Sequence, residues 1–131
     1  MNDNIQATII PYLTVHDGAA ALEFYKKAFG AIEIERFVID GGKLGHAEIQ
    51  IRGAPIYLAD ESLDYGFISA KTIGNTPVTL MLSVPNVTLM FDQAVKAGAT
   101  VVRPLADRGQ GRMGKLIDPF GHHWTLAELK I

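Results

Sequence analysis

The chain contains no cysteine, which excludes disulfide bonds, iron–sulfur clusters, cysteine-based zinc sites and a thiol nucleophile. Neither charge dominates, since twelve basic and fourteen acidic residues give a formal net charge of −2. That balance leaves no electrostatic footprint for nucleic acid or an anionic membrane. No apolar run approaches the roughly 20 residues of a membrane span, and the first residues lack the positive region of a signal peptide. We therefore expect a cytoplasmic protein with no nucleic-acid or membrane partner.

What is present is typical of one globular domain. The 131 residues are 48% hydrophobic and 20% charged, close to the average of soluble domains. A chain of this length buries roughly two-thirds of the surface that it exposes when unfolded, so its core needs no crosslink. We expect a single domain over residues 1–131.

The first half of the chain reads as β-α-β-β-β. A β-branched run over residues 8–15 predicts a strand, Asp17 suits a helix N-cap, and Gly30 suits the end of that helix. Strands are then expected over residues 32–39, 45–51 and 55–59. Alternation in the first of these predicts that Glu33 and Glu35 share one face.

The second half repeats this order after a stretch without clean periodicity. Residues 61–76 contain Gly66, Gly74 and Asn75, with Pro77 directly after them, and are predicted to be a linker or a lid. A strand over 78–84 and a helix ending near Gly98 follow. Further strands are expected over 100–103, where Pro104 would end the strand, and over 115–117 and 122–127.

An internal repeat supports this division. At an offset of 69, Leu13-Thr14-Val15 matches Leu82-Ser83-Val84, and Gly45 matches Gly114. We predict two modules, residues 7–60 and 77–128. The fold class is α+β: two tandem βαβββ modules with pseudo-twofold symmetry, forming a curved, partly open mixed β-sheet with helices on the convex side.

Three segments carry a resemblance to a known family. They are YLTVHDGAAALEFYKKAFGA, GHAEIQIRGAPIYLADE and GRMGKLIDPFGHHWTLAE. Together they resemble the vicinal oxygen chelate superfamily, which includes glyoxalase I, bleomycin-resistance proteins and extradiol dioxygenases, and most of all its PhnB-like branch. The resemblance implies the fold above, a concave ligand-binding face and, in many members, one divalent metal ion. It also implies a homodimer, formed side by side or by swapped modules.

The family's metal ligands are not present at the matching positions of this sequence. The four positions that match the family's ligands hold Ile10, Tyr57, Thr79 and Thr125. A metal site needs histidine nitrogens or carboxylate oxygens in a fixed number, so we expect no metal there and no cofactor. A divalent metal at a non-standard site, built from His46 and Glu48 with His122 or His123, stays an alternative.

Strand alternation defines the candidate ligand-binding residues. The residues expected on one shared concave face are Tyr12, His46, Glu48, Tyr57, Thr79, Met81, His123 and Thr125. Under the alternative reading, His46 and Glu48 face only water on an open sheet. On the glycine-rich loop 108–114, Arg112 and Arg108 either reach an anionic ligand or are solvated surface charges.

Two functions fit these residues. The first is a small-molecule-binding protein that binds or sequesters a metabolite or an antibiotic in the concave cavity. The second is an enzyme of the same superfamily, a lyase, isomerase or dioxygenase, with His46 and Glu48 as an acid/base pair or with a non-standard metal site. We expect a homodimer; the alternative is a monomer whose linker covers its own cavity.

Overall fold

The computed structural model describes residues 4–130, so the first residues, on which the signal-peptide expectation rests, lie outside the described part. Eight strands form two four-stranded mixed sheets. The first sheet has the order β1 (Tyr12–Val15), β4 (Ala54–Asp60), β3 (Leu44–Ile51), β2 (Ile32–Val38). The second has the order β5 (Thr79–Val84), β8 (His123–Glu128), β7 (Arg112–Ile117), β6 (Thr100–Asp107).

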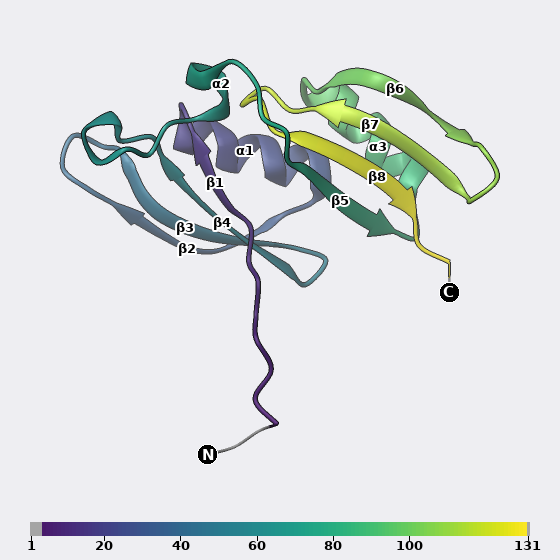
Figure 1. Ribbon diagram of the computed structural model, residues 1–131, viewed down its shortest axis with the longest axis horizontal. Helices are drawn as coiled ribbons and strands as arrows, with labels where there is room; N and C mark the ends of the chain where they lie inside the picture. The colour runs from purple at the N-terminus through teal and green to yellow at the C-terminus, as the bar shows by residue number, and fades with distance from the viewer. Residues whose placement is uncertain (1–3, 131) are drawn as a thin grey trace.

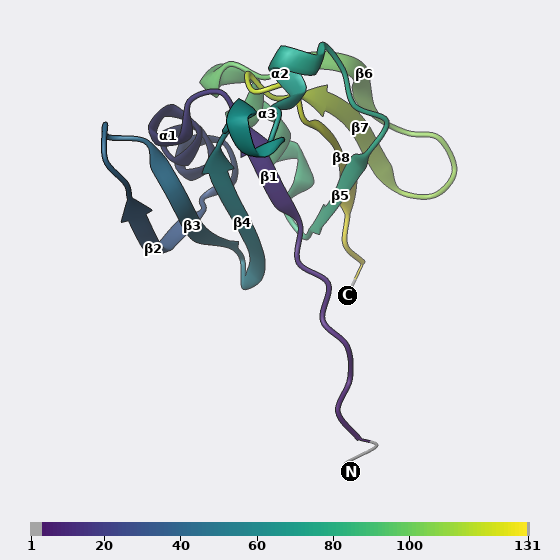
Figure 2. The same ribbon diagram turned by 60° about the vertical axis from the view of Figure 1, so that its left-hand side comes forward.

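Each sheet carries one long helix on one face. Helix α1 (Gly18–Phe29) lies behind the first sheet and α3 (Val87–Ala97) behind the second, with the opposite faces of the two sheets left open (Figure 1). The linker contains a 3-10 turn (Leu63–Tyr65) and the short helix α2 (Ala70–Ile73), and it crosses near one end of both sheets (Figures 1 and 2). The predicted α+β fold with two βαβββ modules is confirmed, and each module forms one four-stranded sheet.

The strand register shows how closely the modules repeat. Leu13 pairs with Leu58 in the first sheet, and Leu82 pairs with Leu126 in the second. All four side chains are buried on the helix side. The expected equivalence of Leu13 and Leu82 therefore holds.

One predicted repeat match is wrong. Ala47 pairs with Leu58, and Gly114 pairs with Leu126, so the structural equivalent of Gly114 is Ala47 and not Gly45. Position 114 must be small because α3 passes close over it. A Cβ atom at Gly114 would lie 2.7 Å from Cε2 of Phe91 on α3.

The predicted alternation in β2 is also wrong, because a β-bulge falls at Ile34. Glu33 pairs with Ile49 and Glu35 pairs with Glu48, so one extra residue is inserted between the two pairs. A bulge of this kind moves the next side chain to the other face. Glu33 accordingly lies on the helix side, where its carboxylate is 2.9 Å from Nζ of Lys26 on α1.

Two predicted strand limits differ from the observed ones. Strand β1 starts at Tyr12, and the preceding segment runs away from both sheets (Figures 1 and 2). Pro11 has no N–H to donate, and only its carbonyl joins the ladder, accepting from the backbone of Tyr57. Strand β6 continues through Pro104 to Asp107, because it is an edge strand on which a missing donor costs little.

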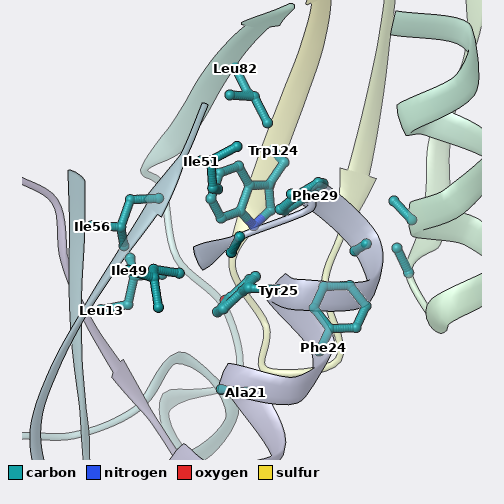
Figure 3. Close-up of a cluster of buried hydrophobic side chains, with 14 of the residues drawn as sticks. Leu13, Ala21, Phe24, Tyr25, Phe29, Ile49, Ile51, Ile56, Leu82 and Trp124 are labelled. Atoms are coloured by element: carbon teal, nitrogen blue, oxygen red, sulfur yellow. The ribbon is translucent and has the colours of Figure 1, made fainter. Parts of the chain in front are cut away.

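The core is one cluster that both modules share. Phe29 and Tyr25 of α1 pack on Trp124 of β8, and the rings of Phe29 and Trp124 lie 4.7 Å apart (Figure 3). Below them the buried Asp118 carboxylate accepts hydrogen bonds from Tyr25 Oη at 2.5 Å and Trp124 Nε1 at 2.8 Å. Helix α1 also packs against α3. The two modules are therefore joined by an aromatic core around a single carboxylate.

Candidate functional site

The open face of the first sheet carries a cluster of three rings. Tyr12 of β1, His46 of β3 and Tyr57 of β4 point to the side away from α1. The Tyr12 and Tyr57 rings meet edge to face at 5.6 Å, and the His46 and Tyr57 rings do so at 4.9 Å. Glu48 belongs to the same face, since it pairs with Tyr57 across the sheet.

His46 has other partners than Glu48. Tyr12 Oη lies 2.7 Å from His46 Nδ1, and His46 Nε2 lies 3.6 Å from the carboxylate of Glu35. Burial, and secondarily the charge of Tyr57, raise the pKa of the Tyr12 phenol above its usual value. The phenol is therefore protonated at neutral pH and shares a hydrogen bond with His46 Nδ1. Sequence reasoning missed Glu35 because the bulge at Ile34 places it on this face.

A hollow of about 640 Å³ lies over one end of this face, and we call it the first hollow. Its walls are the ends of β1, β3 and β4 and the start of the linker. Six of the lining residues are aromatic or aliphatic, and the polar ones include the charged Lys43, Asp60 and Glu61. The lining residues are Tyr12, Thr14, Ile39, Lys43, Leu44, Gly45, Ala59, Asp60, Glu61, Ser62, Tyr65 and Phe67.

Hydrogen bonds hold the linker beside the first hollow. The Glu61 carboxylate accepts from the backbone N–H of Ser69 at 3.0 Å and from the Thr72 hydroxyl at 2.8 Å. These bonds lower the pKa of Glu61 below its usual value. Ser62 and Phe67 also form a β-bridge across the turn between them. The aromatic side chains of Tyr65 and Phe67 are thus presented from a fixed loop.

The open face of the second sheet holds the other predicted residues. Thr79 pairs with His123, and Met81 pairs with Thr125, on the side away from α3. His123 Nε2 lies 3.1 Å from Asn75 Oδ1 of the linker. Burial, and secondarily the charge of Lys115, lower the pKa of His123.

A smaller hollow of about 270 Å³ lies on this second face, and we call it the second hollow. It is lined by three cations, by small or polar groups and by one apolar side chain: Arg103, Arg108, Gln110, Gly111, Met113, Gly114, Lys115 and Thr125. Arg112 does not reach it, because its guanidinium donates to the Thr88 hydroxyl on α3. Alternation explains this, since Met113 and Lys115 face the hollow and Arg112 faces the helix.

The two groups of predicted residues lie on two sheets. Tyr12, His46, Glu48 and Tyr57 come from the first sheet, and Thr79, Met81, His123 and Thr125 from the second. Of these eight residues, Tyr12 lines the first hollow and Thr125 lines the second. Their shared role in ligand binding stays a prediction.

The family's metal does not fit the residues present. The positions that match the family's ligands offer an alkyl group, a phenol and two hydroxyls, at Ile10, Tyr57, Thr79 and Thr125. Among residues 4–130, no three histidine, aspartate or glutamate side chains gather closely enough to hold an ion. We therefore derive no chemical step through a metal.

The two βαβββ modules define an α+β fold class, and comparison with known proteins identifies the family. The model of the Glyoxalase/Bleomycin resistance protein/Dioxygenase superfamily matches residues 5–126, and the chain belongs to this superfamily.

Similar proteins come from distant organisms. An uncharacterised protein of Mycobacterium tuberculosis is 41% identical over 129 residues, covering 95% of this chain and 76% of that protein. The X-ray structure of a gene product from Arabidopsis thaliana has a TM-score of 0.75 at 30% identity, over 95% of this chain and 100% of that one. A PhnB protein from Bacillus cereus has a TM-score of 0.71 at 17% identity, over 94% and 100% of the two chains, which shows the shared fold alone.

None of the helices within residues 4–130 is long and apolar enough to cross a lipid bilayer.

Proposed function

We propose that this protein binds a small, largely apolar molecule in the first hollow, without using a metal. The observation that carries the proposal is the hollow itself, with a volume of about 640 Å³ beside Tyr12, Tyr65 and Phe67. Ligand sites are commonly about 300–1,000 Å³, mostly apolar, with a few polar groups that fix orientation. Thr14, Ser62 and the Tyr12 phenol supply such groups. Binding or sequestering a metabolite or an antibiotic requires no further chemistry.

A fluorescent apolar probe tests this proposal. N-phenyl-1-naphthylamine is uncharged, so the basic second hollow does not attract it. We expect saturable binding with a rise in probe fluorescence, and a several-fold weaker affinity in Phe67→Ser. Filling the hollow with Ala59→Trp should abolish binding while the circular dichroism spectrum stays unchanged.

Phe37→Ser is the matched control. Phe37 is 65% exposed on β2, comparable to Phe67 at 60%, but it does not line the first hollow. Its substitution should leave the affinity unchanged. The proposal fails if the probe does not bind saturably, or if Phe37→Ser and Phe67→Ser weaken it equally.

A second candidate function is an enzyme that uses His46. The contacts of His46 with Tyr12 at 2.7 Å and Glu35 at 3.6 Å favour it, because they orient the imidazole between a phenol and a carboxylate. Elemental analysis of protein purified without chelators tests whether such an enzyme depends on a metal. A stoichiometric divalent ion that is lost in His46→Gln would support the enzyme over the metal-free binding protein.

We further place the chain in the PhnB-like branch, from its sequence motifs, and propose a homodimer. Large apolar side chains stand exposed on β2 and on the linker, among them Ile34, Val38, Leu63 and Ile68. Burial against a second copy would remove this surface from water. A cytoplasmic location stays a prediction from the sequence.

A further inference from the structure

We propose that the second hollow binds a small oxyanion, a carboxylate or a phosphate. This site is separate from the first hollow, since the two hollows lie on different sheets and share no lining residue. The proposal therefore stands independently of the apolar ligand proposed above.

The hollow gathers positive charge without a compensating carboxylate. Arg103, Arg108 and Lys115 all line it, and no aspartate or glutamate does. Within residues 4–130, none of these three cations forms an ion pair. Most surface cations stand far enough apart to be screened by salt, but these three surround one cavity of about 270 Å³.

Two of the cations are set directly opposite each other by the sheet. Arg103 of β6 pairs with Lys115 of β7 in the antiparallel register. Side chains in such pairs start about 5 Å apart, and like charges there destabilise the sheet. An anion bound between them would offset this repulsion. Anion binding therefore accounts for two like charges at this position, whereas solvation alone does not.

The fold does not impose this charge, as the first module shows. By register, Lys115 is equivalent to Glu48, and Arg103 is equivalent to Glu35. In the first sheet the pair is acidic, and His46 lies within 3.6 Å of Glu35. In the second sheet the same two positions are basic, and the structure provides no acidic partner.

Arg108 is fixed in place before any ligand arrives. Its Nη1 donates to the carbonyl of Met113 at 3.0 Å, and its Nη2 donates to the carbonyl of Pro104 at 2.9 Å. The guanidinium keeps further N–H groups for a ligand. A cation held by backbone carbonyls loses little side-chain entropy on binding, which favours affinity.

The size and the remaining lining narrow the ligand class. Gln110 and Thr125 add neutral hydrogen-bonding groups, and Met113 adds an apolar wall. A volume of about 270 Å³ is slightly below the usual range of about 300–1,000 Å³ for drug-sized ligands. A compact molecule with one or two oxyanion groups fits this description better than a nucleotide or a polymer.

Isothermal titration calorimetry at low salt tests the proposal with succinate, inorganic phosphate and uncharged succinamide. We expect saturable binding of at least one anion, and none of succinamide. Hydrogen bonds to charged groups are worth about 1.5–3 kcal/mol, so Lys115→Gln should weaken binding by about tenfold or more. Arg103→Gln/Lys115→Gln should abolish it. Succinate alone or phosphate alone would assign the carboxylate or the phosphate class.

Lys27→Gln is the matched control, because Lys27 is exposed on α1, away from the second hollow. It should bind the anion like the unmodified chain. A second readout is the His123 imidazole, whose pKa, measured by NMR, should rise when an anion neutralises the neighbouring Lys115.

Three results would overturn the proposal: no saturable binding of either anion, equal binding of succinamide, or unchanged affinity in the double variant. Retained binding of N-phenyl-1-naphthylamine by the double variant shows that it is folded and that the first hollow is intact. Failure at one hollow is therefore distinguishable from failure at the other.

Discussion

Asp118 is the residue on which the joining of the two modules depends most. Its side chain is 4% exposed and accepts from the Tyr25 hydroxyl, the Trp124 indole and the backbone N–H groups of Phe120 and His122. Removing the carboxylate would leave four buried or half-buried donors without their hydrogen-bond acceptor. Unsatisfied buried donors cost about 1–3 kcal/mol each, although the costs of neighbouring groups do not add fully.

We therefore expect Asp118→Ala to lower the free energy of unfolding by roughly 3–5 kcal/mol, measured by urea denaturation. Asp92→Ala, an exposed position on α3, should change it by less than about 0.5 kcal/mol. A loss below about 1 kcal/mol in Asp118→Ala would show that the network contributes little to stability.

Glu33 links stability to pH. Hydrogen bonds from Arg36 and then from Lys26 lower the pKa of its carboxyl to about 2. A carboxyl whose pKa is lower in the folded chain stabilises it above the unfolded pKa of about 4.3, and this contribution is lost as the pH falls toward 2.

The stability difference between the unmodified chain and Glu33→Gln should accordingly be constant above about pH 5 and shrink from there toward pH 2. Urea midpoints at a series of pH values measure this difference. If it does not change between those limits, Glu33 is not ionised against Arg36 and Lys26 in the way the contacts indicate.

At the scale of elements, the distance between helix and sheet is set by one glycine in the second module. A Cβ atom at position 114 would lie 2.7 Å from the Phe91 ring and 3.0 Å from the backbone of Leu105. Backbone atoms cannot move aside as a side chain can. Gly114→Ala should therefore destabilise the chain by about 1–3 kcal/mol.

Gly45→Ala is the informative comparison for that variant. There the added Cβ would meet the Ile39 side chain at 2.7 Å, and this side chain is 47% exposed and free to turn away. Thermal unfolding of both variants should give the larger loss for Gly114→Ala. Equal losses would mean that α3 shifts as easily as one surface side chain.

The elements also show what sequence reasoning could and could not predict. Period-two alternation needs only local information, and it placed Tyr12, Tyr57 and Thr125 on the open faces where the structure has them. The partner of His46 depends on a bulge at Ile34, and a bulge leaves no mark in the hydrophobic pattern of an exposed edge strand. The sequence pattern for this reason placed Glu35 on the same face as Glu33.

The presence of two hollows, one on each sheet, could not be predicted from the sequence either. A repeat predicts that the modules have the same fold, but it does not say how the sheets are set relative to each other. Charge at equivalent positions could have revealed the second hollow, because Lys115 and Arg103 replace two glutamates of the first module. That comparison requires the correct register between the modules. The apparent match of Gly45 with Gly114 shifts this register by two residues, because the structural equivalent of Gly114 is Ala47.

At the scale of the whole molecule, several large apolar side chains are exposed to solvent. Tyr65 is 81% exposed, and Ile9 in the segment before β1 is 93% exposed. We expect light scattering at micromolar concentration to give about twice the chain mass of 14.2 kDa. A mass near that of one chain, unchanged on concentration, would favour the monomer with its linker as a lid.

The central claim is that the first hollow binds a small apolar molecule. Its most direct test is an NMR titration of the ¹⁵N-labelled protein with N-phenyl-1-naphthylamine. The account predicts that the shifted backbone signals come from the lining of that hollow, above all Thr14, Ala59, Ser62 and Phe67, and that the signals of Lys115 and Arg103 stay in place. Shifts concentrated on the second sheet, or no saturable shifts at all, would contradict it.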